Sequence, residues 1–170
     1  MNKTKKILLA LFLGLGLIWG SAHAADLKFG YVDLGRIFTE YKKTVEYDKG
    51  LNEKQNLYEA ERDKKVNEVK NLQDKLSLLS EKEKETKKGD LETKVKALQD
   101  FDRQKQTDLR KEQDDKMKEV LKDIEEVVKK YAQNQGYTMV FNDRVLVYQE
   151  KSMDITDKVV EILNKEYKGK

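Results

Sequence analysis

The chain has 170 residues, with 35 Lys and Arg, 32 Asp and Glu, one His, and neither Cys nor Pro. Charged residues make up 39% of the sequence, against about 25% in an ordinary soluble domain, which is too much charge for one compact globule. The absence of Cys excludes disulfides, thiol catalysis and thiolate metal sites. Most familiar enzyme sites are therefore excluded, and we expect no catalytic residue, no metal site and no cofactor.

Residues 1–24 are typical of a secretory signal peptide. Three lysines precede an apolar and glycine run of 13 residues, and Ala22-His23-Ala24 places small residues where a signal peptidase cleaves. The run falls short of the roughly 20 residues of a spanning helix, so an uncleaved anchor is the weaker alternative. We expect cleavage after Ala24 and export of the mature chain, which would remove His23, the only histidine.

The mature chain would carry no net charge. The predicted signal peptide, residues 1–24, contains three lysines and no acidic residue, so 32 basic and 32 acidic residues remain after its cleavage. No strongly basic face follows from this composition, and we expect no nucleic acid partner.

Apolar residues are concentrated in the two flanks of the mature chain. Residues 42–130 contain 24 apolar side chains in 89 positions, whereas residues 25–41 and 131–170 together contain 26 in 57. We therefore expect residues 25–41 and 131–170 to form one small body, and residues 42–130 to extend away from it and return.

The segment 42–130 predicts two long helices. It contains no Pro and only two Gly, and most of its residues are good helix formers. Its apolar residues follow the 3-4 spacing of a coiled-coil seam at Val69, Leu72, Leu76 and Leu79, and again at Met117, Val120, Ile124, Val127 and Tyr131. Gly89 suits the end of one helix and Asp90 the start of the next, which predicts the turn of an antiparallel hairpin at Gly89.

The predicted seam is thin in its middle. Residues 102–116 contain a single apolar side chain, Leu109, so burial stabilises this stretch little. Two interpretations stay open: a solvated charged helix, or arms that bend and splay.

The flanks predict three strands and one helix. Residues 27–34, 138–141 and 145–149 have the composition of strands, with a turn at 142–144 that would join the last two in a hairpin. Asp154 is the expected N-cap of a terminal helix. So small a core, without disulfides or a metal, predicts oligomerisation.

The sequence resembles the Skp family of periplasmic chaperones, also called OmpH-like. The similar segments are FGYVDLGRIF at 29–38, the long charged helical region, GYTMVFNDRVLVY at 136–148 and DITDKVVEIL at 154–163. The resemblance implies an α+β, mostly helical fold, with a small β body from the chain ends and a long antiparallel α-helical coiled-coil hairpin. It also implies a jellyfish-like homotrimer whose helical tentacles enclose a cavity for unfolded outer-membrane β-barrel proteins.

Two functions stay open at the level of the sequence. The first is an ATP-independent holdase chaperone of the periplasm, in agreement with the absence of a G-x-x-x-x-G-K phosphate loop. The second is a passive coiled-coil spacer or adaptor of the cell envelope, for which a filled seam would be expected. An enzyme is a distant third, because the mature chain has no histidine to activate a serine.

Candidate client-binding residues lie on both arms. Apolar residues whose spacing fits the seam poorly could line a cavity, and the candidates are Tyr47, Leu51, Leu57 and Tyr58, with Phe101 and Leu121 on the second arm. The strand residues are expected to form the core and the trimer interface: Phe29, Tyr31, Val32, Leu34, Met139, Phe141, Leu146, Val147 and Tyr148.

Lysines gather near the predicted tip of the hairpin. Residues 75–96 contain seven basic and five acidic side chains. These lysines are the candidates for electrostatic binding of clients or for contact with a membrane or lipopolysaccharide. They are Lys82, Lys84, Lys87, Lys88, Lys94 and Lys96. Family members are often markedly basic and this mature chain is neutral, so we favour the simpler explanation that these lysines keep an exposed tip soluble.

Overall fold

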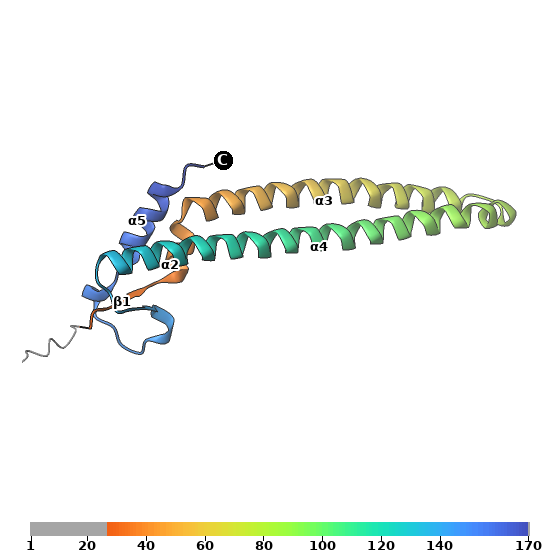
Figure 1. Ribbon diagram of the computed structural model, residues 1–170. Helices are drawn as coiled ribbons and strands as arrows, with labels where there is room; N and C mark the ends of the chain where they lie inside the picture. The colour runs from red at the N-terminus through yellow and green to blue at the C-terminus, as the bar shows by residue number, and fades with distance from the viewer. Residues whose placement is uncertain (1–26, 170) are drawn as a thin grey trace, which may run out of the picture.

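The computed structural model describes residues 27–169, so the predicted signal peptide lies outside the described residues. The elements are β1 (Phe29–Val32), α2 (Leu34–Glu40), α3 (Lys42–Ser77), α4 (Glu81–Asn134), β2 (Met139–Asn142), two 3-10 turns, η1 (Asp143–Val145) and η2 (Lys151–Met153), and α5 (Thr156–Glu166). The chain is mostly helical, with a small two-stranded sheet at one end of a long pair of helices (Figure 1).

Helix α3 lies beside α4 along its length, and α4 continues past the start of α3 toward the base (Figure 1). Ion pairs join Lys54 to Glu112, Arg62 to Asp102 and Glu68 to Lys94. From the first of these ion pairs to the last, the residue number on α3 rises and the residue number on α4 falls. The two helices therefore run in opposite directions, and the chain reverses at the end far from the sheet.

The turn between the two helices is not at Gly89, and that prediction is wrong. Helix α3 ends at Ser77 and α4 begins at Glu81. The carboxylate of Glu83 accepts hydrogen bonds from the backbone N–H of Ser80 at 3.1 Å and from its hydroxyl at 2.5 Å. A Ser-x-x-Glu sequence satisfies donors that every helix start leaves unpaired, whereas Gly89 lies inside α4 with open space around it.

The two strands pair in parallel, with Phe29 opposite Met139 and Tyr31 opposite Phe141. The first strand is shorter than predicted because Asp33 caps α2, its carboxylate accepting a hydrogen bond from the Arg36 N–H at 2.8 Å. Helix α2 itself was not predicted.

The predicted third strand, residues 145–149, is wrong. The Asn142 side chain accepts a hydrogen bond from the Arg144 N–H at 3.2 Å, which starts the turn η1 and directs the chain off the sheet. Residues 146–150 are irregular. Within the described residues, β2 pairs only with β1, so its other edge is free of strand partners.

The core lies where β1, α2, α5 and the last turns of α4 meet. Ile37, Val120, Val159 and Leu163 are almost completely buried there. The N–H of Asp33 donates to the Thr156 hydroxyl at 2.9 Å, which joins the start of α2 to the start of α5. Asp154 precedes α5 by one residue more than predicted, and its carboxylate still accepts a hydrogen bond from the Thr156 N–H, at 2.8 Å.

Candidate functional site

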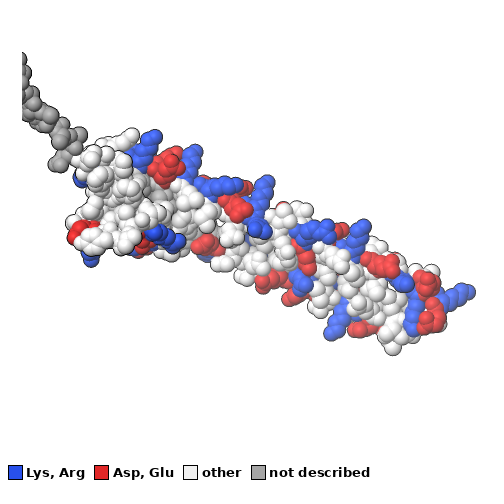
Figure 2. Space-filling model, turned by 90° about the horizontal axis from the view of Figure 1, so that it is seen from below, with Lys and Arg blue, Asp and Glu red and all other residues white. Residues whose placement is uncertain are grey.

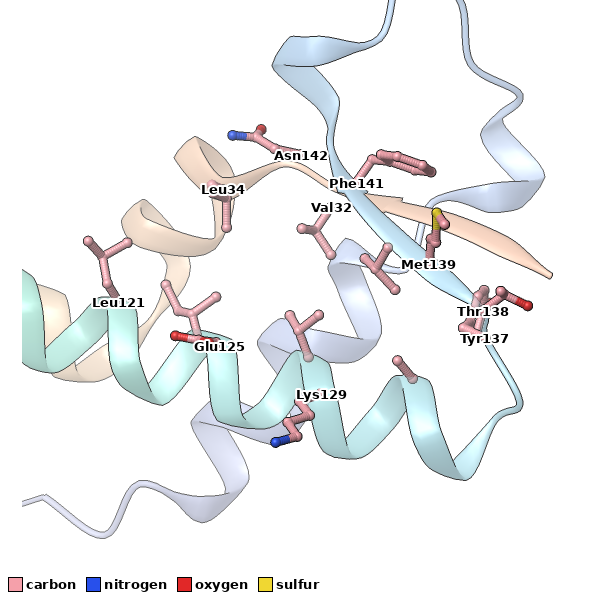
Figure 3. Close-up of a pocket in the computed structure, with 14 residues that line it drawn as sticks. Val32, Leu34, Leu121, Glu125, Lys129, Tyr137, Thr138, Met139, Phe141 and Asn142 are labelled. Atoms are coloured by element: carbon pink, nitrogen blue, oxygen red, sulfur yellow. The ribbon is translucent and has the colours of Figure 1, made fainter. Parts of the chain in front are cut away.

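An apolar groove of about 550 Å³ opens between the strands and the last turns of α4. Figure 3 shows α4 on one side, with Leu121, Glu125 and Lys129, and the strands on the other, with Val32 and Met139. The helix contributes residues one turn apart, and its Leu121, Ile124, Val128 and Ala132 line the groove. The groove is therefore built by helical spacing on one wall and by the consecutive residues 137–142, with Val32 and Leu34, on the other.

Apolar side chains around this groove remain in contact with solvent. Met139 is 53% exposed and Leu121 is 42% exposed. Val147 and Tyr148, in the irregular segment after η1, are almost fully exposed. Leu121 and Met139 therefore leave apolar surface open to solvent at the groove itself, and exposed apolar surface is typical of interaction sites.

The residues predicted as core and trimer interface divide into three groups by their burial in the single chain. Tyr31 and Val32 are buried within the single chain, so they stabilise its own core. Phe29 and Phe141 are half-buried, with ring centroids 6.3 Å apart. Leu34 and Leu146 are also half-buried. Met139, Val147 and Tyr148 are the exposed members of the set.

Tyr58 lies between the two long helices, and the prediction that it falls outside the seam is wrong. It is the one buried residue of α3. Its ring lies 5.8 Å from that of Phe101, and its hydroxyl donates to Asp102 at 3.2 Å. Asp102 also accepts a hydrogen bond from Arg62 at 3.2 Å. Tyr58 therefore holds the two helices together and offers little surface to a ligand.

The remaining apolar candidates on the hairpin are more accessible. Leu57 is 66% exposed, and Leu51 is half-buried. Phe101 is half-buried, and the ammonium groups of Lys65 and Lys105 lie 5.0 and 5.6 Å from its ring centre. The aromatic ring of Phe101 is therefore already occupied by cation–π contacts with these two lysines.

A charged cluster joins α3 to α4 near the core. Lys43 forms ion pairs with Glu119 and Asp123, each at 2.7 Å. Lys43, and to a smaller extent Tyr47, hold the pKa of Glu119 down at about 2. Burial, together with the neighbouring Glu119, raises the pKa of Tyr47 to about 12. The predicted client-binding residue Tyr47 is therefore half-buried in this cluster, with the Lys116 ammonium 4.1 Å from its ring centre.

The six lysines near the tip all lie on the first turns of α4, since the turn precedes them. Five are exposed and Lys84 is half-buried. Glu81 pairs with Lys84 at 2.7 Å and Glu68 pairs with Lys94 at 3.1 Å. Figure 2 shows blue and red side chains alternating along the hairpin, with mostly uncharged surface around the base. No extended patch of one sign covers the face seen there.

The described residues contain no cluster of three or more His, Cys, Asp or Glu side chains placed to hold a metal ion. None of the helices described is both long enough and apolar enough to cross a membrane.

The comparisons with known proteins agree with this architecture. The profile of the family described as "Outer membrane protein (OmpH-like)" matches residues 28–163. A crystal structure from Caulobacter crescentus CB15, assigned as an OmpH-like outer membrane chaperone, superposes with a TM-score of 0.77. The two sequences are 18% identical, and the alignment covers 91% of this chain and 94% of the other. No curated protein matches the sequence significantly.

A helical hairpin on a small base with a two-stranded sheet is the fold of an OmpH-like protein. The family profile covers most of the chain, and the protein belongs to the OmpH-like family.

Proposed function

We propose that this protein is an ATP-independent holdase chaperone of the periplasm, which binds unfolded outer-membrane β-barrel proteins and prevents their aggregation before insertion. The observation that carries the proposal is the open apolar groove at the base of a highly charged hairpin. Membership of the OmpH-like family and the fold shared with a chaperone from Caulobacter crescentus support it.

The working form in this proposal is a homotrimer. The free edge of β2 offers unpaired backbone groups to another chain, and Met139, Val147 and Tyr148 offer apolar surface beside it. Residues 25–41 and 131–170 would supply the contacts between copies. Three antiparallel coiled-coil hairpins, residues 42–130, would then extend like tentacles around a shared cavity. Any contact with a membrane or with lipopolysaccharide would occur at the tips of the hairpins, through the exposed Leu78 and the nearby lysines.

Export belongs to the same proposal. The pattern of residues 1–24 supports cleavage after Ala24. Mass spectrometry of envelope fractions should find a mature N-terminus at Ala25, and a major species that retains residues 1–24 would contradict this part of the proposal.

Suppression of aggregation tests the proposal directly. A β-barrel protein unfolded in urea is diluted into buffer with the purified chaperone and without nucleotide, and turbidity is followed. We expect turbidity to fall sharply at a small molar excess of chaperone, whereas a charged helical control protein of similar size should have no effect. Equal turbidity with and without this protein would favour the spacer instead.

A further inference from the structure

The two faces of the α3–α4 pair differ at the level of Leu109. On one face, Lys54 pairs with Glu112 at 2.5 Å and Lys105 pairs with Glu61 at 3.8 Å, so ion pairs cross between the helices. The opposite face carries an open groove of about 630 Å³. Among the described residues, no ion pair crosses the groove on this face.

Amide side chains line the open groove in a hairpin that is otherwise dominated by charge. Its walls and floor are formed by Leu51, Asn52 and Gln55 on α3 and by Gln106, Leu109 and Gln113 on α4. The two leucines are half-buried, whereas Asn52, Gln106 and Gln113 are exposed. One acidic and one basic residue, Asp48 and Arg110, complete the lining, so the groove has no net charge.

This chemistry matches the main chain of a polypeptide. A carboxamide both donates and accepts hydrogen bonds, and each residue of an unfolded chain presents one N–H and one C=O that need partners. A groove without net charge gives no advantage to a charged ligand. Leucines on the floor give apolar side chains a place to pack.

We propose that this groove binds a short extended stretch of unfolded polypeptide through its backbone amides, with apolar side chains of the ligand resting on Leu51 and Leu109. The proposal rests on the proposed function and adds the chemistry by which the client is recognised. Each wall spans eight residues of helix, 48–55 and 106–113, a rise of about 10 Å, which accommodates about three residues of extended chain at roughly 3.3 Å each.

Recognition of the backbone explains how clients of different sequence can be held. One groove makes only a few hydrogen bonds, and each is weak because it replaces hydrogen bonds to water. Equivalent grooves on other copies of the chain would bind further segments of the same client, and the combined affinity exceeds that of any one groove.

The test uses the full chain and two peptides. The probe is a neutral ten-residue peptide of alternating Val and Thr with blocked ends, and its partner is the same peptide with every second backbone nitrogen methylated. We compare the wild type with Gln106→Met/Gln113→Met, which keeps side-chain length and helix propensity but removes both amides. The control, Gln73→Met/Gln104→Met, makes the same change at exposed positions outside the groove. Circular dichroism should be the same for all three proteins.

We expect the side-chain NH2 signals of Asn52, Gln106 and Gln113 to shift when the first peptide is added to the wild type, whereas Gln55 already donates its NH2 to Glu59 at 2.9 Å. The groove variant should bind that peptide about tenfold more weakly, as for loss of one or two hydrogen bonds, and the control should bind it like the wild type. Methylation should weaken binding to the wild type and the control but not to the groove variant.

Absence of shifts at these amides, or equal binding by the groove variant and the control, would overturn the inference. The same proteins are assayed for suppression of β-barrel aggregation. If the wild type suppresses aggregation while the peptide result is negative, the groove proposal fails and the chaperone proposal stands. If the wild type does not suppress aggregation, the chaperone proposal itself fails.

Discussion

The hydroxyl of Tyr58 on α3 donates a hydrogen bond to Asp102 on α4 at 3.2 Å, at a level of the hairpin where no other side chain of α3 is buried. The buried residues of α4 all lie near the core. Beyond the base, half-buried apolar residues of both helices, such as Leu72 and Leu98, and partly exposed ion pairs also contribute to contact between the helices. Exposed ion pairs contribute about 0–1 kcal/mol each, and Tyr58 is the most completely buried side chain of α3.

Tyr58→Ala should lower the stability of the hairpin by about 2–3 kcal/mol, at the low end for loss of a buried aromatic side chain because the site can partly collapse. Tyr58→Phe should cost about 1 kcal/mol, the net worth of one hydrogen bond. Hydrogen exchange of α3 and α4 amides measures both effects. Unchanged exchange in Tyr58→Ala would mean that the helices are held together elsewhere.

Gly89→Ala distinguishes the turn seen in the structure from the one predicted by sequence. Gly89 lies inside α4 with no atom near the position of an added Cβ. Alanine should therefore stabilise the protein by about 0.5–1 kcal/mol, whereas Glu83→Ala should destabilise the start of α4 by about 1 kcal/mol. Thermal denaturation gives the sign. A lower melting temperature for Gly89→Ala would instead support a turn at residue 89.

The location of the turn was hidden from sequence reasoning by two competing signals. Lys88-Gly89-Asp90 has the composition of a helix end followed by a helix start, while the true N-cap of α4, Ser80, directly follows Leu79, which was predicted as a seam residue. The reciprocal contact with Glu83 decides the outcome, and only the folded backbone brings these groups together. An error in the turn also shifts the register of the helices, which is why the pairing of Tyr58 with Phe101 was missed.

The long helices and the helix α5 could be predicted because their apolar spacing is a local property of the chain. A strand is different, because it exists only where another strand offers an edge. Val145 and Val147 have strand composition, but the Asn142 side chain turns the chain off the sheet. The apolar groove was also beyond prediction, since Val32 and Leu34 in its lining come from a segment about 100 residues before the others.

Gly30→Ala should destabilise the protein, because an added Cβ would lie 2.8 Å from the ring of Tyr137. Overpacking of this kind costs about 1–3 kcal/mol. Gly50→Ala is the matched control in α3, where no atom lies within 4 Å of the added Cβ, and it should be neutral or stabilising. Urea denaturation monitored by circular dichroism measures both. Similar midpoints for the two variants would contradict the close packing of β1 against Tyr137.

The ion pair of Glu119 with Lys43 predicts a loss of stability at low pH. The pKa of Glu119 is about 2 in the folded protein, below the value of about 4.3 for an unfolded chain. Its contribution is therefore fully present above pH 5 and is lost as the pH falls toward 2. The carboxylate is 45% exposed, so after solvent screening the effect should not exceed about 1 kcal/mol.

A carbon NMR titration of the Glu119 carboxyl group measures this pKa, with Lys43→Met as the variant. The methionine keeps the length of the side chain and removes its charge. The midpoint should rise toward the ordinary value in the variant. The same midpoint in both proteins would show that Lys43 does not set the ionisation of Glu119.

Val147→Asp tests the assembly without disturbing the core of a single chain. Val147 is fully exposed, so a carboxylate there meets water in an isolated copy, and circular dichroism of the monomer should be unchanged. Buried against another copy, the same charge would have no partner, at a cost of several kcal/mol. Light scattering should therefore give about three chain masses for the wild type and one for the variant at micromolar concentration. Lys151→Asp changes an exposed neighbour outside the apolar segment and should leave the assembly intact. A variant Val147→Asp that still forms trimers would place the contact between copies elsewhere, and a folded wild-type monomer would exclude the trimer altogether.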